Sequence, residues 1–345
     1  MKKLFLFLFL LLLVGGGIAA WIFLGPATGF RENKKYLYIA SAAPTKKAVL
    51  DSLQKNRILN NEAAFEFLAN RLNYWTQIKP GKYEIKKGSS LLDIVRRLRN
   101  GSQSPVDLVI TKFRTKEDFA RMVGRRFETD STQMLAFLNS ADSLSKFKTS
   151  PELSMVNVIP DKYTYFWNSS PSLIYEKLYK ESQKFWTDER KKKAQSLGLL
   201  PEQVYILASI IEEETTNHSE KDTIASVYLN RLNIGMPLQA DPTLKFATKQ
   251  FELKRIAGEI LNVESPFNTY KNKGLPPGPI CTPSRTTIDA VLNPASTPYL
   301  FFVANRNLNG HLFSVEFGEH KTKANQYREE DKARREADSI KNAGK

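Results

Sequence analysis

The chain has 345 residues, which is enough for two modest domains or for one domain with a long appendage. Its hydrophobic content of 41% and charged content of 25% are ordinary for a globular protein. The net charge of +15 favours an anionic partner such as a membrane surface, a cell-wall polymer or a nucleic acid, and is equally compatible with a basic soluble protein. No basic stripe is interleaved with aromatic residues, so nucleic acid is not an expected partner.

Cysteine and histidine are too sparse in this sequence for a disulfide framework or a zinc site. Cys281 is the one cysteine, so an intrachain disulfide is excluded. His218, His311 and His320 lie far apart, without the spacing of metal ligands. We therefore expect neither a metal nor another cofactor.

The N-terminus has the pattern of a membrane span. Residues 1–3 contain two lysines, and residues 4–24 follow without a charge, long enough for a helix of about 30 Å. A cleaved signal peptide is the alternative, with small residues at Ala19 and Ala20 near the cleavage point. Because the apolar run continues past them, we predict an uncleaved, single-pass inner-membrane anchor. The lysines place the N-terminus in the cytoplasm, so residues 25–345 are expected outside the membrane.

After a polar linker at 25–35, the region 36–112 is predicted to begin with a strand at 36–40. Thr45 has the residue type of a helix N-cap, and the next apolar pattern predicts a second helix over 61–72.

A compact pattern of strand, helix and strand follows in this N-terminal region. The alternation over 81–86 predicts a strand, and a turn and a serine cap then lead into a helix that stops at Gly101. Residues 106–110 read as a returning strand. The unit resembles the LysM glycan-binding module, although β-α-β units of this kind are common and many bind nothing.

Further amphipathic helices are predicted over 115–127, 131–140 and 171–186, the first with Thr115 and an aspartate in capping-box positions. The aromatic residues within 163–167 either stack on sugars or fill the core. The charged tail at 329–345 is predicted to be a solvated helix without a site.

The sequence YILASIIEEETTNHSEKD, residues 205–222, places three glutamates after an apolar run. A helix that begins near Pro201 is apolar on nearly every face, so it is expected to be buried. At about 100° per residue, Glu212 continues a row that contains Ala208 and Ser209, whose small side chains leave space for a ligand.

Burial in that row would raise the pKa of Glu212, as a general acid near neutral pH requires. Glu213 and Glu214 continue bulkier rows, so we expect them to be hydrated or to have supporting roles. A solvated helix end with no catalytic role is the alternative, and periodicity alone does not decide between the two.

Longer motifs support the catalytic interpretation. ASIIEEET is followed in order by ASVYLNRLNIGMPLQADPTLKF, SPFNTYKNKGLPPGPICTPS, AVLNPA and GHLFS. Together with the anchor and the LysM-like unit, these motifs resemble the YceG-like family of endolytic murein transglycosylases. The resemblance implies an α+β fold in which residues 113–328 form a mixed α+β catalytic domain.

The resemblance also implies a reaction and a catalytic residue. It implies cleavage of the β-1,4 bond between N-acetylmuramic acid and N-acetylglucosamine in peptidoglycan, with a 1,6-anhydro end as product and Glu212 as the catalytic residue. One carboxyl suffices if the C6 hydroxyl of the sugar attacks its own anomeric carbon, because Glu212 can first donate and then accept a proton. A lysozyme-type hydrolase that uses Glu212 and Asp241 is one alternative, and a non-catalytic wall-binding scaffold is another.

Several polar residues are assigned to substrate positioning, although hydrogen bonds that stabilise loops explain each of them equally well. They are Asn230, Gln239, Asp241, Asn268 and Tyr270. Relatives usually carry an acidic residue where this chain has Met155, so no role is assigned there. The expected partners are peptidoglycan glycan strands and, as the family implies, the peptidoglycan synthases whose nascent strands such an enzyme would terminate.

Overall fold

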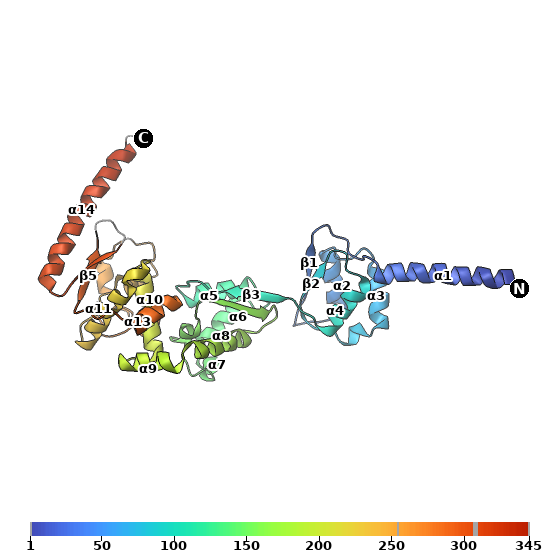
Figure 1. Ribbon diagram of the computed structural model, residues 1–345, viewed down its shortest axis with the longest axis horizontal. Helices are drawn as coiled ribbons and strands as arrows, with labels where there is room; N and C mark the ends of the chain where they lie inside the picture. The colour runs from blue at the N-terminus through green and yellow to red at the C-terminus, as the bar shows by residue number, and fades with distance from the viewer. Residues whose placement is uncertain (1, 254, 306–309, 344–345) are drawn as a thin grey trace. The chain divides into compact units, whose positions relative to one another are not determined.

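The structure is a computed structural model that describes residues 2–253, 255–305 and 310–343 (Figure 1). The chain divides into two compact units. The first comprises Met1–Leu108, Arg121–Met134 and Tyr163–Pro171, and the second comprises Val109–Ala120, Leu135–Lys162 and Ser172–Lys345. Helices and short strands occur in both units, which confirms the α+β class.

Helix α1 (Lys2–Leu24) is the one helix within the described residues that is long and apolar enough to cross a membrane. None of its residues is buried in the protein, and its mean hydropathy is 2.5. The prediction of a single apolar N-terminal helix is confirmed. Its length and composition fit a membrane anchor, and a signal sequence has the same two properties.

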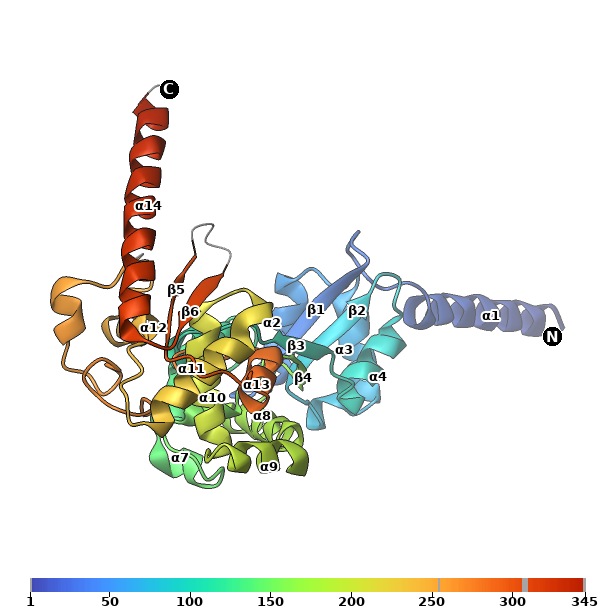
Figure 2. The ribbon, with the colours of Figure 1, turned by 60° about the vertical axis from the view of Figure 1, so that its left-hand side comes forward.

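An antiparallel pair of strands organises the core of the first unit. Strand β1 (Lys34–Ile39) pairs with β2 (Gly81–Lys86), with Ile39 opposite Gly81. Figure 2 shows this pair beside helices α2 (Lys46–Lys55), α3 (Glu62–Arg71) and α4 (Leu91–Asn100). Alternate strand residues and one stripe of each helix meet in a single apolar cluster, which includes Leu37, Ile39, Tyr83, Ile85, Val49, Leu53, Phe65, Ile94 and Leu98.

Local capping explains where these helices begin and end. Thr45 accepts a hydrogen bond from the N–H of Ala48, and Ser90 accepts one from the N–H of Asp93, so the predicted caps are confirmed. Gly101 ends α4 at a φ of 72°, a left-handed conformation that glycine adopts without strain.

The predicted β-α-β unit is correct in its elements and wrong in its pairing. Strand β3 (Pro105–Val109) pairs with β4 (Lys162–Phe166), whereas the partner of β2 is β1. The segment from β2 to β3 therefore does not close on itself, because each of its strands is hydrogen-bonded to a segment outside it. Its LysM-like identity stays a prediction.

Short helices occupy the middle of the chain. Thr115 and Asp118 exchange backbone and side-chain hydrogen bonds at the start of α5, which confirms the predicted capping box. Tyr163 and Tyr165 on β4 are buried, so two of the aromatic residues proposed as sugar platforms fill the core instead. The elements here are α5 (Lys116–Gly124), α6 (Ser131–Asn139), α7 (Ala141–Ser145), α8 (Pro171–Phe185) and α9 (Asp188–Ser196), with 3-10 turns η1 (Tyr74–Thr76) and η2 (Ser154–Asn157).

The second unit is built around helix α10 (Pro201–Glu214), every residue of which is buried from Val204 to Ile211. This confirms the expected buried helix, which Pro201 opens at its first position. Helix α10 packs against three helices, α11 (Lys221–Asn233), α12 (Asp241–Thr248) and α13 (Arg285–Leu292).

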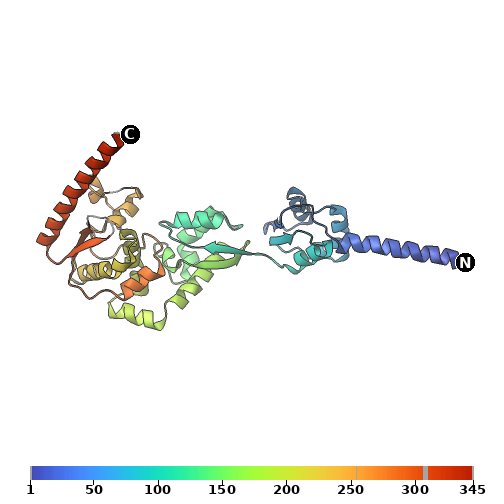
Figure 3. The same ribbon diagram turned by 45° about the horizontal axis from the view of Figure 1, so that its top comes forward.

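The chain then forms an antiparallel hairpin of β5 (Phe301–Ala304) and β6 (His311–Ser314), after the 3-10 turns η3 (His218–Glu220) and η4 (Gly258–Asn262). It continues as one long helix, α14 (Phe317–Ala343), the red helix of Figure 3. The tail is helical as predicted, but it is not fully solvated, since Asp331 is buried and pairs with Arg255 at 2.5 Å.

Candidate active site

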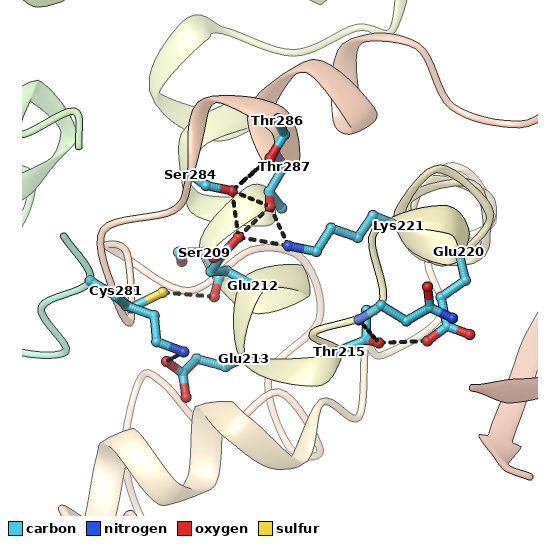
Figure 4. A network of polar contacts seen from close by, with 12 residues as sticks. Ser209, Glu212, Glu213, Thr215, Glu220, Lys221, Cys281, Ser284, Thr286 and Thr287 are labelled. Atoms are coloured by element: carbon cyan, nitrogen blue, oxygen red, sulfur yellow. Dashed lines mark hydrogen bonds and ion pairs between the residues drawn. The ribbon is translucent and has the colours of Figure 1, made fainter. Parts of the chain in front are cut away.

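The three glutamates at the end of α10 reach three different environments, because successive residues of a helix point about 100° apart. Glu212 meets Lys221 and two hydroxyl groups of the α13 region, as Figure 4 shows. Glu213 meets two basic side chains, and Glu214 meets Tyr228 of α11.

Glu212 is held in a saturated hydrogen-bond network. Its Oε2 accepts bonds from Lys221 Nζ and Ser284 Oγ, both at 3.0 Å, and from the Thr287 hydroxyl. Lys221 also donates to Thr287 at 2.7 Å, and the side chains of Glu212 and Lys221 are only 15% and 3% exposed. This network is a buried ion pair whose partners are both satisfied.

The network also determines the protonation of Glu212. Burial raises the pKa of this carboxyl, but the hydrogen bonds from Thr287 and Lys221 and the charge of Lys221 outweigh it, so the pKa lies below its ordinary value. The predicted net rise in the pKa of Glu212 is therefore wrong, although burial acts in the predicted direction.

The space predicted beside Glu212 is filled by protein. Ser209 Oγ accepts a hydrogen bond from the backbone N–H of Ile280 at 3.0 Å, and its carbonyl accepts one from Cys281 Sγ at 3.3 Å (Figure 4). The small residues of this row thus admit the chain around Ile280 and not a ligand.

Glu213 is an ion-pair partner. Arg114 approaches its Oε2 through Nε at 3.1 Å and Nη2 at 3.0 Å, and Lys112 approaches Oε1 at 3.0 Å. With 12% of its side chain exposed, this carboxylate joins α10 to residues 112–114. A supporting role was expected for Glu213, and the contacts confirm it.

Glu214 lines a polar cavity of about 390 Å³. The Tyr228 hydroxyl donates to Glu214 Oε1 at 2.6 Å. The cavity is also lined by Arg231, Leu238, Gln239, Asp241, Tyr270, Phe302, Val303, Ala304, His311 and His320. All of these residues belong to the second unit, and they come from α11, α12, the hairpin β5–β6, α14 and two loops.

The environment of Glu214 shifts its protonation toward neutral pH. Burial raises its pKa to about 7, the Tyr228 hydrogen bond opposes this, and the nearby charge of Asp241 adds to the increase. A carboxyl with this pKa is protonated in an appreciable fraction of molecules near neutral pH, as a general acid must be.

Asp241 is a second carboxyl in the same cavity. It begins α12, and the Tyr270 hydroxyl donates to its Oδ1. Burial raises the pKa of Asp241, and the bond from Tyr270 opposes the rise. Beside it, Gln239 has a φ of 50°, and its backbone N–H donates to the carbonyl of Thr269 at 3.0 Å.

Arg231 fixes the loop that carries these groups. Its guanidinium donates to the carbonyls of Leu300, Pro237 and Leu238, at 2.6, 3.2 and 2.8 Å. Hydrogen bonds to carbonyls leave its positive charge uncancelled beside the cavity, where it lowers the pKa of Glu214.

The predicted site residues divide into two groups. Gln239, Asp241 and Tyr270 line the cavity, whereas Asn230 and Asn268 do not. Asn230 donates to the carbonyls of Thr297 and Tyr299, and Asn268, fully buried, donates to those of Leu261 and Val263. These two amides hold loops, and their assignment to substrate contact stays a prediction.

Glu214, and not Glu212, is the glutamate that lines the cavity together with Gln239 and Asp241. Sequence reasoning missed it because Glu214 ends the helix, where Thr215 is already extended. One signal was available: Tyr228 and Arg231 lie three residues apart on one face of α11, and both polar side chains are buried. His311 and His320 were considered only as metal ligands, and within the described ranges no group of three or more metal-ligating side chains occurs.

Met155, where relatives were expected to carry an acidic residue, lines a different cavity of about 240 Å³ together with Arg114 and Cys281. It is absent from the cavity of Glu214, so its replacement leaves that site unchanged.

Comparisons with known proteins identify the family of this chain. Residues 38–326 match the YceG-like family. A Bacillus subtilis (strain 168) protein named endolytic murein transglycosylase is 29% identical over 279 residues, covering 75% of this chain and 76% of its own. A protein of the same name from Streptococcus pneumoniae (serotype 2, strain D39) is 28% identical over 310 residues, covering 79% of this chain and 55% of its own.

A crystal structure of a YceG-like protein from Listeria monocytogenes is similar over 85% of this chain and 99% of that chain, with a TM-score of 0.56 and 26% identity. The family match extends over most of the chain and includes every residue that lines the cavity of Glu214. The chain belongs to the YceG-like family.

Proposed function

We propose that the protein is a lytic transglycosylase that cleaves peptidoglycan strands internally, and that Glu214 is its general acid. The names of the relatives support murein as the substrate class. The observation that carries the proposal is the position of Glu214, a carboxyl with a pKa of about 7 in a polar cavity that it shares with Gln239, Asp241 and Tyr270.

The reaction follows from this carboxyl. Protonated Glu214 donates its proton to the glycosidic oxygen as the bond from that oxygen to the anomeric carbon of N-acetylmuramic acid breaks. The C6 hydroxyl of the same sugar forms the new bond to the anomeric carbon and loses its proton, in the simplest scheme to the Glu214 carboxylate. No water is consumed, and the product is a 1,6-anhydro end.

Neighbouring residues support both protonation states of Glu214. Tyr228 fixes the carboxyl with its 2.6 Å hydrogen bond, and the Arg231 charge stabilises the carboxylate that forms when the proton leaves. Gln239, Asp241 and Tyr270 supply amide, carboxyl and phenol groups for the hydroxyl and N-acetyl groups of the sugar.

A hydrolytic reaction is the second candidate, and the presence of two carboxyls in one cavity favours it. Glu214 would be the acid and Asp241 the base that activates water. Mass spectrometry of the products separates the two reactions, since hydrolysis yields ends heavier by one water than the anhydro ends.

The remaining expectations extend this proposal. Helix α1 would anchor the protein in the inner membrane with its N-terminus in the cytoplasm. Residues 113–328 would form the catalytic domain, the LysM-like unit within 36–112 would contact glycan, and peptidoglycan synthases would supply nascent strands. A protease-protection experiment tests the orientation of the chain in the membrane. Residues 25–345 should be protected in intact cells and cleaved once the cell envelope outside the inner membrane is permeabilised.

The test of the acid compares two isosteric variants of the full chain in detergent, Glu214→Gln and Glu212→Gln. We expect Glu214→Gln to lose no thermal stability and to release anhydro-muropeptides at least about 100-fold more slowly. Glu212→Gln removes the ion-pair partner of the buried Lys221, so its main expected effect is a lower melting temperature. Wild-type activity in Glu214→Gln would overturn the assignment, and selective loss in a folded Glu212→Gln would restore Glu212 as the catalytic residue.

A further inference from the structure

A buried Glu–His pair beside Glu214 has no part in the one-carboxyl reaction. Glu220 of η3 is 8% exposed and contacts His311, which lines the cavity of Glu214. We propose that His311, oriented by Glu220, accepts the proton of the attacking sugar hydroxyl. The inference rests on the proposed function, and it divides the acid and base roles between Glu214 and His311.

Glu220 is committed to orienting its neighbours. Its Oε1 accepts a hydrogen bond from the Thr215 hydroxyl at 2.5 Å, the contact drawn in Figure 4. Its Oε2 accepts the backbone N–H of His311 at 3.0 Å, and the Nδ1 of the His311 ring lies 2.9 Å from Oε1. Thr215 directly follows Glu214, so the same carboxylate ties the end of α10 to strand β6.

These contacts determine the tautomer of His311. A carboxylate only accepts hydrogen bonds, so the Nδ1 that faces Glu220 must carry the hydrogen. A neutral imidazole has one N–H, which leaves Nε2 without a hydrogen and with a free lone pair. That nitrogen is the basic atom of the ring, and the contact of Glu220 with Nδ1 fixes the tautomer and orientation that present it.

Packing restricts the orientation of the ring. The edge of Phe302 contacts His311 at a centroid distance of 5.1 Å and an angle of 86°. Gly310 allows the close approach of the backbone, because a Cβ at this position would lie 2.9 Å from Glu220 Oε2. The His311 side chain is only 14% exposed, yet it lines the cavity, so it is held in place there.

His320, the other histidine of this cavity, lacks such support. Its ring stacks on Phe301 at 5.2 Å and 21°, and its buried Nδ1 has no hydrogen-bond partner. Burial and the positive charges of Arg231, Arg328 and Lys323 lower its pKa. Within the part of the chain that the structure describes, no carboxylate binds this Nδ1, so of the two rings His311 is the one arranged for proton transfer.

The proposed step conserves atoms and charge. The O6–C1 bond forms while the C1–O4 bond breaks, the hydroxyl proton moves from O6 to His311 Nε2, and the Glu214 proton moves to O4. The site is left with an imidazolium and a carboxylate. Transfer of one proton between them through solvent restores the starting state.

The test uses His311→Asn in the full chain in detergent. An asparagine amide can reproduce the Nδ1 donor toward Glu220 and has no atom in place of Nε2, so the fold is expected to be retained. We expect kcat for anhydro-muropeptide release to fall about 100-fold with KM little changed. His218→Asn at an exposed position is the matched control and is expected to keep wild-type rates.

The pH profile adds a second readout. A general base acts only in its unprotonated form, so the acidic limb of the kcat profile should differ between wild type and His311→Asn. The other titratable groups of the cavity are Glu214, Tyr228, Arg231, Asp241, Tyr270 and His320, and all of them are unchanged in the variant. Retained kcat, a change confined to KM, or an unchanged acidic limb would each overturn the inference.

Nitrogen-15 NMR of the histidine rings separates this inference from the proposed function, because it needs no activity. Wild type is expected to show a neutral His311 with hydrogen on Nδ1, and Glu220→Gln should shift the ring toward the other tautomer. A hydrogen on Nε2 in the wild type would contradict the inference even if the protein is an active transglycosylase. If wild type forms no anhydro ends while the ring has the expected tautomer, the proposed function fails, and the base role fails with it.

Discussion

Glu212 and Glu214 lie two residues apart on α10, and both are surrounded by protein, yet their pKa values move in opposite directions. Glu212 meets a lysine and two hydroxyl groups, which favour the charged carboxylate. Glu214 accepts one hydrogen bond from a phenol, which does not offset burial, and the charge of the nearby Asp241 raises its pKa further. The difference teaches that the partners of a carboxyl, and not its depth, decide whether it stabilises the fold or remains available as an acid.

The largest effect is expected from removing the partner of Glu212. Lys221→Met leaves the Glu212 carboxylate buried without a cation, which should destabilise the protein by about 3–5 kcal/mol. Urea denaturation measures the loss. The double variant Lys221→Met with Glu212→Gln should recover much of it, and no recovery would show that the pair does not stabilise through its charges.

The second largest expected effect is on the pH dependence of stability, which should have opposite signs for Glu212 and Glu214. The raised pKa of Glu214 means that the folded protein binds the extra proton, so stability falls as pH rises from about 4.5 to about 7. Because folding lowers the pKa of Glu212, its carboxylate stabilises the fold at pH values above the pKa that Glu212 has in the unfolded chain. This contribution disappears as the pH falls through the pKa of Glu212 in the folded protein. Melting temperatures should therefore rise in Glu214→Gln at pH 8 and fall in Glu212→Gln, and equal shifts would contradict the comparison.

Tyr228→Phe is expected to have a smaller, kinetic effect. The Tyr228 hydrogen bond lowers the pKa of Glu214, so its removal should raise that pKa and move the alkaline limb of the activity profile to higher pH. We expect kcat to fall by about tenfold, because the carboxylate loses a donor worth about 1.5 kcal/mol or more. An unchanged alkaline limb would mean that Glu214 is not the group that titrates there.

The smallest effects should separate loop-holding residues from cavity residues. Asn230→Ala removes hydrogen bonds to two carbonyls and should cost about 1–3 kcal/mol of stability, with KM unchanged. Gln239→Ala removes a cavity amide and should raise KM while leaving stability close to wild type. The reverse outcome for the two variants would return Asn230 to the substrate site.

Most secondary structure was predictable because it depends on local patterns. The caps at Thr45 and Ser90, the stop at Gly101 and the buried run of α10 were all readable from residues close in sequence. The pairing of β2 was not predictable from the sequence. Its partner β1 lies more than forty residues away, and the two strands pair through backbone groups that every sequence has.

The sequence by itself determined the family, the apolar N-terminal helix and the segment that carries the proposed catalytic carboxyl, since long motifs and hydrophobic periodicity specify these. Only the tertiary structure decided which glutamate has which environment. Lys221, Ser284 and Thr287 bind Glu212 from positions up to 75 residues away. Tyr228 binds Glu214, and the charge of Asp241 acts on it. The position of a residue along a helix predicts the direction in which its side chain points. The pKa of that side chain depends on which groups the rest of the fold places around it.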